Sequence, residues 1–192
     1  MPINLPMMLT WLRILMIPLF VAFYYLPESL VSLSVRDTVA ALVFIAAAIT
    51  DWFDGWLARR WNQTSAFGAF LDPVADKLMV CAALLVLLDL QRVDVFIAFI
   101  IIGREITISA LREWMAKIGA SGSVAVHWLG KFKTAAQMVA IPCLLYWQPL
   151  YGVPMSWVGV ILIIIAAVLT VWSMFYYLKR AWPQIRDKSG VA

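Results

Sequence analysis

The sequence predicts an all-α integral membrane protein with about six transmembrane helices, on the strength of its composition and of the lengths of its apolar stretches. Hydrophobic residues make up 64% of the 192 residues and charged residues only 14%, whereas typical soluble domains have about 45–50% and about 25%. Apolar stretches of about 20 residues, enough for a helix to cross a bilayer, follow one another along the chain. Because no linker or repeat divides them, we expect a single domain over residues 1–192.

Six spans are expected, in the order of the chain. Residues 1–10 have no basic run and no small-residue cleavage site, so we expect no signal peptide. Pro2 and Pro6 bracket a short segment that we expect in the membrane interface. The spans are predicted over residues 10–26, 37–61, 70–88, 95–114, 124–147 and 157–178. Polar or turn-forming residues at 62–65, 120–123 and 148–154 separate several of them.

Lysine and arginine are distributed unequally between the two ends of these spans. One end has Arg59, Arg60, Arg112, Lys117, Lys131, Lys133, Lys179, Arg180, Arg186 and Lys188. Loops at the other end contain only Arg36 and Arg92. Because positively charged loops stay in the cytoplasm, we expect both termini there, in a multi-pass protein of the cell (inner) membrane. The net charge of +4 is spread over these loops, which indicates attraction to anionic lipid and no binding of nucleic acid.

Four aspartates stand out in this apolar chain, since ionisable groups at membrane depth are costly and usually functional. They are Asp51, Asp54, Asp72 and Asp76. On helices, spacings of three and four residues place each pair on one face. Two such helices facing each other would bring the four carboxylates to one point, where bound cations must neutralise them. Oxygen ligands favour Mg²⁺, Mn²⁺ or Ca²⁺ over a soft metal.

The aspartates belong to a longer pattern, Asp-x2-Asp-Gly-x2-Ala-Arg-x8-Gly-x3-Asp-x3-Asp. Its eight positions are filled by Asp51, Asp54, Gly55, Ala58, Arg59, Gly68, Asp72 and Asp76. This pattern resembles the signature of the CDP-alcohol phosphotransferase family. Further likeness, in Asn4-Leu-Pro, in Thr10-x2-Arg13 and in the segments around Arg104, Arg112 and Lys133, extends it over nearly the whole chain.

The resemblance implies an enzyme of phospholipid biosynthesis with six transmembrane helices, usually a homodimer. It implies that Asp51, Asp54, Asp72 and Asp76 hold divalent metal, Mg²⁺ or Mn²⁺, as two ions, and that Asp76 is the general base. The implied reaction transfers the phosphatidyl group of CDP-diacylglycerol to glycerol 3-phosphate and releases CMP. The residues expected to contact CDP-diacylglycerol are Gly55, Ala58, Arg59, Ser65 and Gly68.

A second polar cluster lies in the fourth and fifth spans. It comprises Arg104, Glu105, Arg112, Lys131 and Lys133. Glu105 and Arg112 are seven residues apart and share a helical face, so an internal ion pair is one interpretation. The basic groups outnumber this glutamate, however, and a surplus of lysine and arginine suits a phosphate dianion. We therefore expect Arg104, Arg112, Lys131 and Lys133 to bind glycerol 3-phosphate.

Other functions remain open at this stage. A cation or proton transporter also uses intramembrane carboxylates, but it needs polar groups along the full membrane depth. Here the carboxylates cluster toward one side, and the opposite halves of the spans are Leu, Ile and Val. A closer alternative is another phosphotransferase of the same family with inositol phosphate, serine or phosphatidylglycerol as acceptor. The signature does not distinguish these acceptors, nor does it reveal acyl-chain preference.

Overall fold

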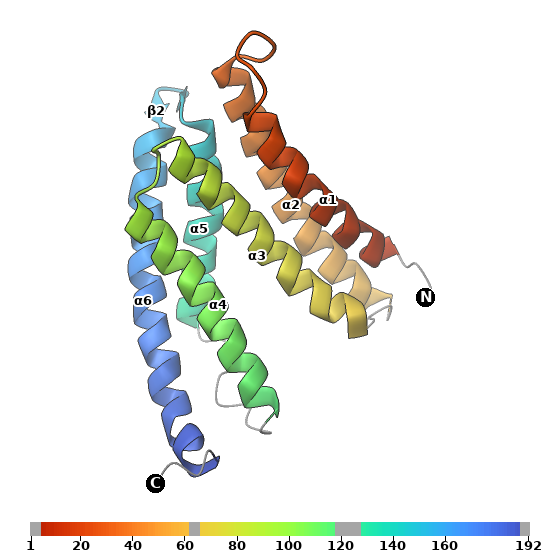
Figure 1. Ribbon diagram of the computed structural model, residues 1–192, viewed down its shortest axis with the longest axis vertical. Helices are drawn as coiled ribbons and strands as arrows, with labels where there is room; N and C mark the ends of the chain where they lie inside the picture. The colour runs from red at the N-terminus through yellow and green to blue at the C-terminus, as the bar shows by residue number, and fades with distance from the viewer. Residues whose placement is uncertain (1–4, 62–65, 118–127, 189–192) are drawn as a thin grey trace.

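The computed structural model describes residues 5–61, 66–117 and 128–188, and this part of the chain is helical almost throughout (Figure 1). The helices are α1 (Leu5–Tyr24), α2 (Leu33–Arg60), α3 (Ala66–Asp89), α4 (Val95–Lys117), α5 (Trp128–Tyr146) and α6 (Met155–Lys188). Two strands of two residues each, β1 (Pro149–Leu150) and β2 (Val153–Pro154), form an antiparallel hairpin between α5 and α6. Each predicted span corresponds to one of the helices, which confirms the all-helical class.

The N-terminal segment continues into the first helix. α1 begins at Leu5, so residues 5–10 form its first turns, and their place in the membrane interface stays a prediction. Pro6 is compatible with this position because the first turn of a helix has no partner for a backbone N–H. The expected turn at 148–154 is the β1–β2 hairpin, whose loop residues Tyr151 and Gly152 have φ values of 49° and 82°.

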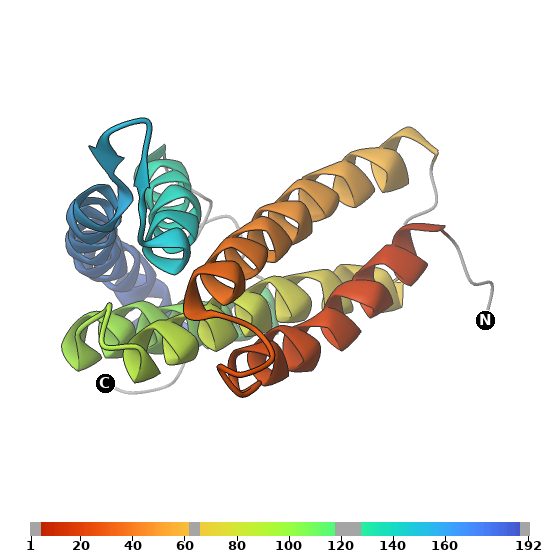
Figure 2. The same ribbon diagram turned by 90° about the horizontal axis from the view of Figure 1, so that it is seen from above.

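The helices form two groups that separate toward one end of the molecule. The first arm consists of α1, α2 and α3, and the second arm of α4, α5 and α6 (Figures 1 and 2). Within the first arm, α1 packs more extensively against α2 and against α3 than those two helices pack against each other. The closest pairing in the second arm is between α5 and α6, and α2 packs on α5 to join the arms.

A close approach of backbones explains the tight α5–α6 pair. Gly159 of α6 lies against Leu144 of α5, so that a Cβ atom added there would come within 2.6 Å of the leucine side chain and 3.0 Å of its backbone nitrogen. Any larger residue at position 159 would require Leu144 or its helix to shift.

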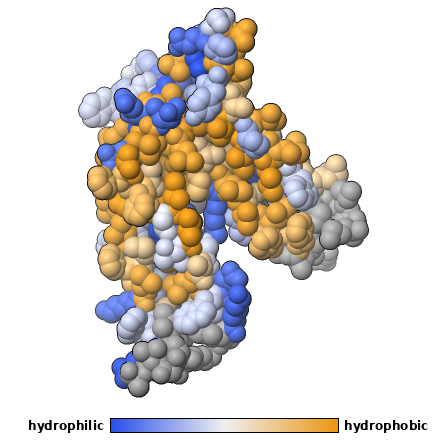
Figure 3. Space-filling model, in the orientation of Figure 1, coloured by the Kyte–Doolittle hydropathy of each residue, from blue (hydrophilic) through white to orange (hydrophobic). Residues whose placement is uncertain are grey.

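The surface of the described helices is largely apolar (Figure 3). Large side chains such as Phe96 and Phe99 are 76% and 73% exposed, which suits contact with lipid. Within the described residues, two helical stretches qualify as membrane spans by length and composition, Leu33–Phe53 with a mean hydropathy of 1.7 and Met155–Pro183 with 2.7. Helices α3 and α4 contain charged residues of the predicted site, and Met8–Tyr24 of α1 is a shorter apolar stretch.

A buried ion pair ties the arms together at the end where α2 begins. Arg92, in the turn after α3, donates to the carboxylate of Asp37 in α2 at 2.7 Å, and both side chains are buried. The same guanidinium donates to the carbonyl oxygens of Leu144 and Leu145 at 3.2 and 2.8 Å, near the end of α5. It also lies 5.0 Å from the centre of the Trp147 ring. Arg92 thus connects α2, the α3–α4 turn and α5.

Candidate active site

The predicted site residues lie at the opposite end, where the arms diverge. Asp51 is fourteen residues after Asp37 on α2, about 21 Å along the helix axis. The ends of α2, α4 and α6 and the beginnings of α3 and α5 all point toward this end, which is hollowed between the two arms in the space-filling view (Figure 3). The carboxylates of the signature come from the first arm. The basic residues of the second polar cluster, called the basic cluster below, come from α4 and α5 of the second arm: Arg104, Arg112, Lys131 and Lys133.

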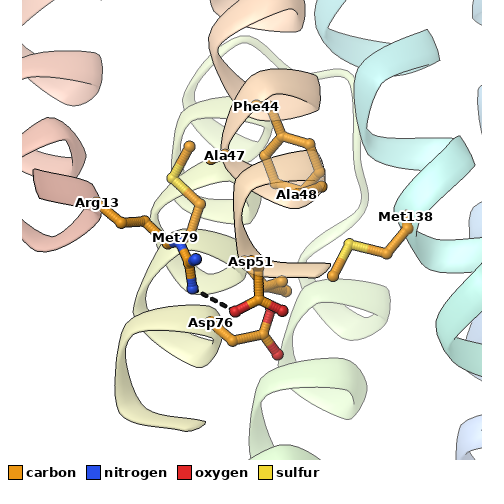
Figure 4. Close-up of a pocket in the computed structure, with 9 residues that line it drawn as sticks. Arg13, Phe44, Ala47, Ala48, Asp51, Asp76, Met79 and Met138 are labelled. Atoms are coloured by element: carbon orange, nitrogen blue, oxygen red, sulfur yellow. Dashed lines mark hydrogen bonds and ion pairs between the residues drawn. The ribbon is translucent and has the colours of Figure 1, made fainter. Parts of the chain in front are cut away.

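Asp51 of α2 and Asp76 of α3 line one small pocket, with their carboxylates directed toward each other (Figure 4). Arg13 of α1 reaches into the same pocket and forms an ion pair with Asp51. The remaining walls are apolar and include Phe44, Ala47, Ala48, Met79, Val80 and Met138. The free space is about 10 Å³, roughly the size of one water molecule or ion.

Asp72 is held separately, also by α1. Its carboxylate accepts a hydrogen bond from the Thr10 hydroxyl at 2.6 Å. Thr10 and Arg13 are three residues apart, so one face of α1 serves an aspartate of α3 and one of α2. This explains why α1 packs against both helices. Within the described residues no donor engages Asp76, whose oxygens remain available.

Several predicted residues fall outside what the structure describes. Ser65 lies in the segment 62–65, which is not described. Five further predicted residues lie on the helical backbone of α2 or α5, but the structure does not describe their side chains. They are Asp54, Gly55, Ala58, Arg59 and Lys131. Gly68 is described in the first turn of α3, four residues before Asp72. Of the four carboxylates, those of Asp51 and Asp76 lie together in one pocket; the convergence of all four stays a prediction.

The pocket suits a divalent cation by its donor chemistry. Two carboxylates from different helices face a space of ionic size, and hard oxygen donors are the ligands that Mg²⁺ and Mn²⁺ prefer. Among residues 5–61, 66–117 and 128–188, no group of three or more acidic, histidine or cysteine side chains is close enough to form a complete metal site. Asp54, one turn from Asp51, is the natural candidate for a further ligand.

The second cluster is centred on Glu105. This carboxylate accepts hydrogen bonds from Lys133 of α5 and, at 3.1 Å, from Arg104. Arg104 also approaches the Ser173 hydroxyl oxygen of α6, at 3.4 Å. Lys133 and Arg104 are both buried, with 2% and 7% of their side chains exposed. The cluster therefore joins all three helices of the second arm.

Arg112 does not form the ion pair with Glu105 that its spacing suggested. No carboxylate in the described part of the chain pairs with Arg112, and Glu113 instead pairs with Lys117 at 2.9 Å. The Arg112 guanidinium lies 5.9 Å from the centre of the Tyr177 ring. Arg104 and Lys133 contact the one carboxylate of Glu105, and Arg112 adds a third positive charge, which leaves two positive charges in excess.

The two clusters are close enough for their charges to interact. The carboxyl group of Asp76 interacts electrostatically with the negative charges of Asp51 and Glu105. It also interacts with the positive charges of Arg13 and Lys77. The site thus combines an acidic pocket with a basic cluster that has charge to spare. Such a pairing can hold a cation beside one phosphate group and a second anion nearby.

Sequence reasoning missed Ser173 and Tyr177 as parts of the basic cluster. Both lie in the last predicted span among residues that read as ordinary apolar and aromatic membrane contacts. Both are 1% exposed in the structure. The sequence feature that could have indicated their role is a polar serine four residues before a tyrosine, on the same face of one helix.

Comparison with known sequences defines the class of the protein. The profile of the CDP-alcohol phosphatidyltransferase family matches residues 3–172, so the chain belongs to this membrane-bound family. It is also similar to enzymes named CDP-diacylglycerol–glycerol-3-phosphate 3-phosphatidyltransferase. Those of Shigella flexneri serotype 5b and Salmonella typhimurium are each 49% identical and that of Escherichia coli K12 is 48% identical. Each alignment spans 190 residues, 98% of this chain and 100% of the relative.

Proposed function

We propose that this protein transfers the phosphatidyl group of CDP-diacylglycerol to glycerol 3-phosphate, giving phosphatidylglycerol phosphate and CMP. Full-length similarity to enzymes of that name supports it. The observation in the structure that carries it is the juxtaposition of the Asp51–Asp76 pocket with a basic cluster that has two positive charges in excess. The reaction needs both, because one substrate carries a diphosphate and the other a phosphate.

In the proposed reaction a hydroxyl group of glycerol 3-phosphate attacks the phosphorus that bears the diacylglycerol. The new P–O bond forms as the bond to CMP breaks. Asp76 takes the proton of the attacking hydroxyl, since its oxygens accept no hydrogen bond from the described residues. A divalent cation, two ions by the family resemblance, would neutralise charge on the diphosphate and on the departing CMP. Asp51, Asp54, Asp72 and Asp76 would hold it.

Arg13 and Thr10 keep the aspartates in place in this scheme. Arg13 orients Asp51, and Thr10 orients Asp72. Both contacts come from α1, so the positions of the carboxylates depend on a helix outside the aspartate signature. Gly55, Ala58 and Gly68 would leave room for the cytidine nucleotide, with Arg59 and Ser65 beside its phosphates or sugar.

The basic cluster is the proposed binding site for glycerol 3-phosphate. Arg112 is exposed and has no carboxylate partner among the described residues, so its planar guanidinium can bind two phosphate oxygens. Arg104 and Lys133 contribute charge from buried positions beside Glu105. Lys131, two residues before Lys133, is the fourth proposed contact.

An apolar groove of about 300 Å³ between α2, α5 and the hairpin is the proposed place for an acyl chain of CDP-diacylglycerol. Its walls include Leu42 and Ile45 of α2 and Pro142 and Cys143 of α5. The same two helices line the carboxylate pocket further along, through Ala48 and Met138. Ile45 lies six residues from Asp51, about 9 Å along α2, so the groove lies further along the same helix, toward the hairpin end of the molecule.

We propose that all six helices cross the inner membrane, with both termini and the active site toward the cytoplasm, and that the protein is a homodimer. The basic residues at the site end support this orientation. Accessibility of single introduced cysteines to a membrane-impermeant reagent tests the orientation. Light scattering of the protein in detergent tests the dimer.

The activity is tested with purified protein, CDP-diacylglycerol and Mg²⁺ by release of CMP. Glycerol 3-phosphate is compared with inositol phosphate, serine and phosphatidylglycerol as acceptors. Release that depends on glycerol 3-phosphate alone is expected. Preference for another acceptor would contradict the proposed substrate while leaving the family reaction intact.

A further inference from the structure

One aromatic ring contacts both arginines of the basic cluster. The centre of the Tyr177 ring lies 5.8 Å from the guanidinium carbon of Arg104 and 5.9 Å from that of Arg112. The arginines are eight residues apart on α4, and Tyr177 is on α6. The ring thus lies beside two cationic groups that repel each other, and its negative face attracts each of them within the usual range of about 6 Å.

The ring is held firmly. Tyr177 is 1% exposed and packs in a buried cluster with Ile108 and Met115 of α4 and Ala181 of α6. A ring in such a cluster keeps one orientation, since rotation would disturb close-packed neighbours. Contact with this ring therefore fixes the positions of the two guanidinium groups relative to a rigid part of the second arm.

The arginines keep hydrogen-bond donors for a ligand. Arg104 is buried, and its Nε–H has no acceptor among the described residues. Arg112 has no carboxylate partner there. Contact with a ring face leaves the edge of a guanidinium free, and the edge carries the donors that bind phosphate oxygens.

Tyr177 and Ser173 also lie beyond residues 3–172, which match the family profile, whereas the four aspartates lie within them. The ring therefore belongs to a part of α6 that the shared family pattern does not cover. It is not among the residues that the aspartate signature would identify.

We propose that Tyr177 is a positioning residue that sets Arg104 and Arg112 at the separation needed to bind the phosphate group of the acceptor. The proposal rests on the proposed function, and it assigns to α6 a part in acceptor recognition. Tyr177 acts through the arginines and touches neither the reacting phosphorus nor the attacking hydroxyl.

The test compares Tyr177→Leu, which removes the ring, with Tyr177→Phe, which keeps it. In the full-length protein, Tyr177→Leu should raise the KM for glycerol 3-phosphate about tenfold, as loss of cation–π contacts allows. The KM of Tyr177→Leu for CDP-diacylglycerol should stay within about twofold of that of the unchanged protein. Tyr177→Phe should have the same KM values for both substrates as the unchanged protein. Phe175→Leu is the matched control, since Phe175 is on the same helix but 64% exposed.

Ring-fluorinated phenylalanine at position 177 provides a test that does not depend on the leucine variant folding. Fluorine weakens the negative ring face while the shape changes little, so the KM for glycerol 3-phosphate should rise with each fluorine. An unchanged KM, an equal rise for both substrates, or failure of Tyr177→Phe to restore activity would overturn the inference. If the unchanged protein fails to use glycerol 3-phosphate at all, the proposed function falls first.

Discussion

Asp51 and Asp72 illustrate how single side chains are prepared for their role. Each accepts a contact from α1, Asp51 from Arg13 and Asp72 from Thr10, whereas Asp76 accepts none from the described residues. The aspartates are thus not equivalent, although they are equivalent members of one sequence pattern. We therefore expect different effects when Asp51 or Asp72 is replaced and when Asp76 is replaced.

We expect Asp51→Asn, Asp54→Asn and Asp72→Asn each to abolish metal-dependent transfer while the protein remains folded in detergent. Replacing a carboxylate by an amide removes a charge from the cation site but hardly changes side-chain volume. CMP release across a Mg²⁺ titration and thermal unfolding measure the two effects. Full activity in any purified variant would remove that residue from the essential set.

Asp76→Asn should retain binding of CDP-diacylglycerol better than turnover. The amide cannot take the proton of the acceptor hydroxyl, although it can still occupy the pocket beside Asp51. Equilibrium binding of CDP-diacylglycerol and the rate of CMP release are compared in the same preparation. Equal losses of both would indicate that Asp76 acts as a ligand and not as a base.

Arg112→Ala should raise the KM for glycerol 3-phosphate roughly ten- to a hundredfold, equivalent to about 1.5–3 kcal/mol for a charge-assisted contact. The KM for CDP-diacylglycerol should change far less. Thermal stability should be nearly unchanged, because Arg112 is exposed and pairs with no carboxylate among the described residues. Lys117→Ala is the control, since Lys117 is a solvent-exposed cation on the same helix. A loss of stability without a change in KM would make Arg112 a structural residue.

At the scale of the helices, the lengths of the apolar stretches predicted the number and order of the helices well. Their contacts were less predictable, because a pairing such as Lys133 with Glu105 depends on how α4 and α5 each pack against α6. Spacing on one helix suggested Arg112 as the partner of Glu105, but Arg104 and Lys133 occupy that carboxylate instead. Sequence spacing thus drew attention to the charged residues of the cluster, whereas tertiary packing decided their partners and added Ser173 and Tyr177.

The α5–α6 pair offers a test at this scale. Gly159→Ala should lower the free energy of unfolding by about 1–3 kcal/mol, since an added methyl group meets Leu144 in a filled interface. Gly103→Ala is the matched control, because a Cβ there meets nothing within 4 Å. It should be neutral or stabilise α4 by up to about 1 kcal/mol. Thermal unfolding in detergent compares them, and equal effects would contradict the close approach.

At the scale of the whole molecule, Arg92 is the residue whose role the sequence hid. It was one of two basic residues in loops of the sparsely charged end and had no apparent partner. The structure places it in a buried contact with Asp37, fifty-five residues away in the chain. A separation of that length leaves no periodic signal, so only the assembled fold reveals the pair.

Arg92→Ala should lower the free energy of unfolding by about 3–5 kcal/mol, because it leaves the Asp37 carboxylate buried without its partner. Replacing both residues with apolar ones, as in Arg92→Met with Asp37→Leu, should recover much of this loss. Glu113→Ala, which breaks an exposed pair, should change stability by no more than about 1 kcal/mol. A small effect of Arg92→Ala in thermal unfolding would exclude it as the tie between the arms.

The division into two arms has an evolutionary consequence. The carboxylates lie on α2 and α3, while Arg104, Arg112, Lys133 and Tyr177 lie on α4, α5 and α6. On the proposed function, mutations in α4 and α6 are expected to change which alcohol is accepted with little effect on α2 and α3, whereas changes in α5 also reach the carboxylate pocket through Met138. A fold organised in this way allows gene duplicates to acquire new acceptors one helix at a time while the ancestral chemistry persists.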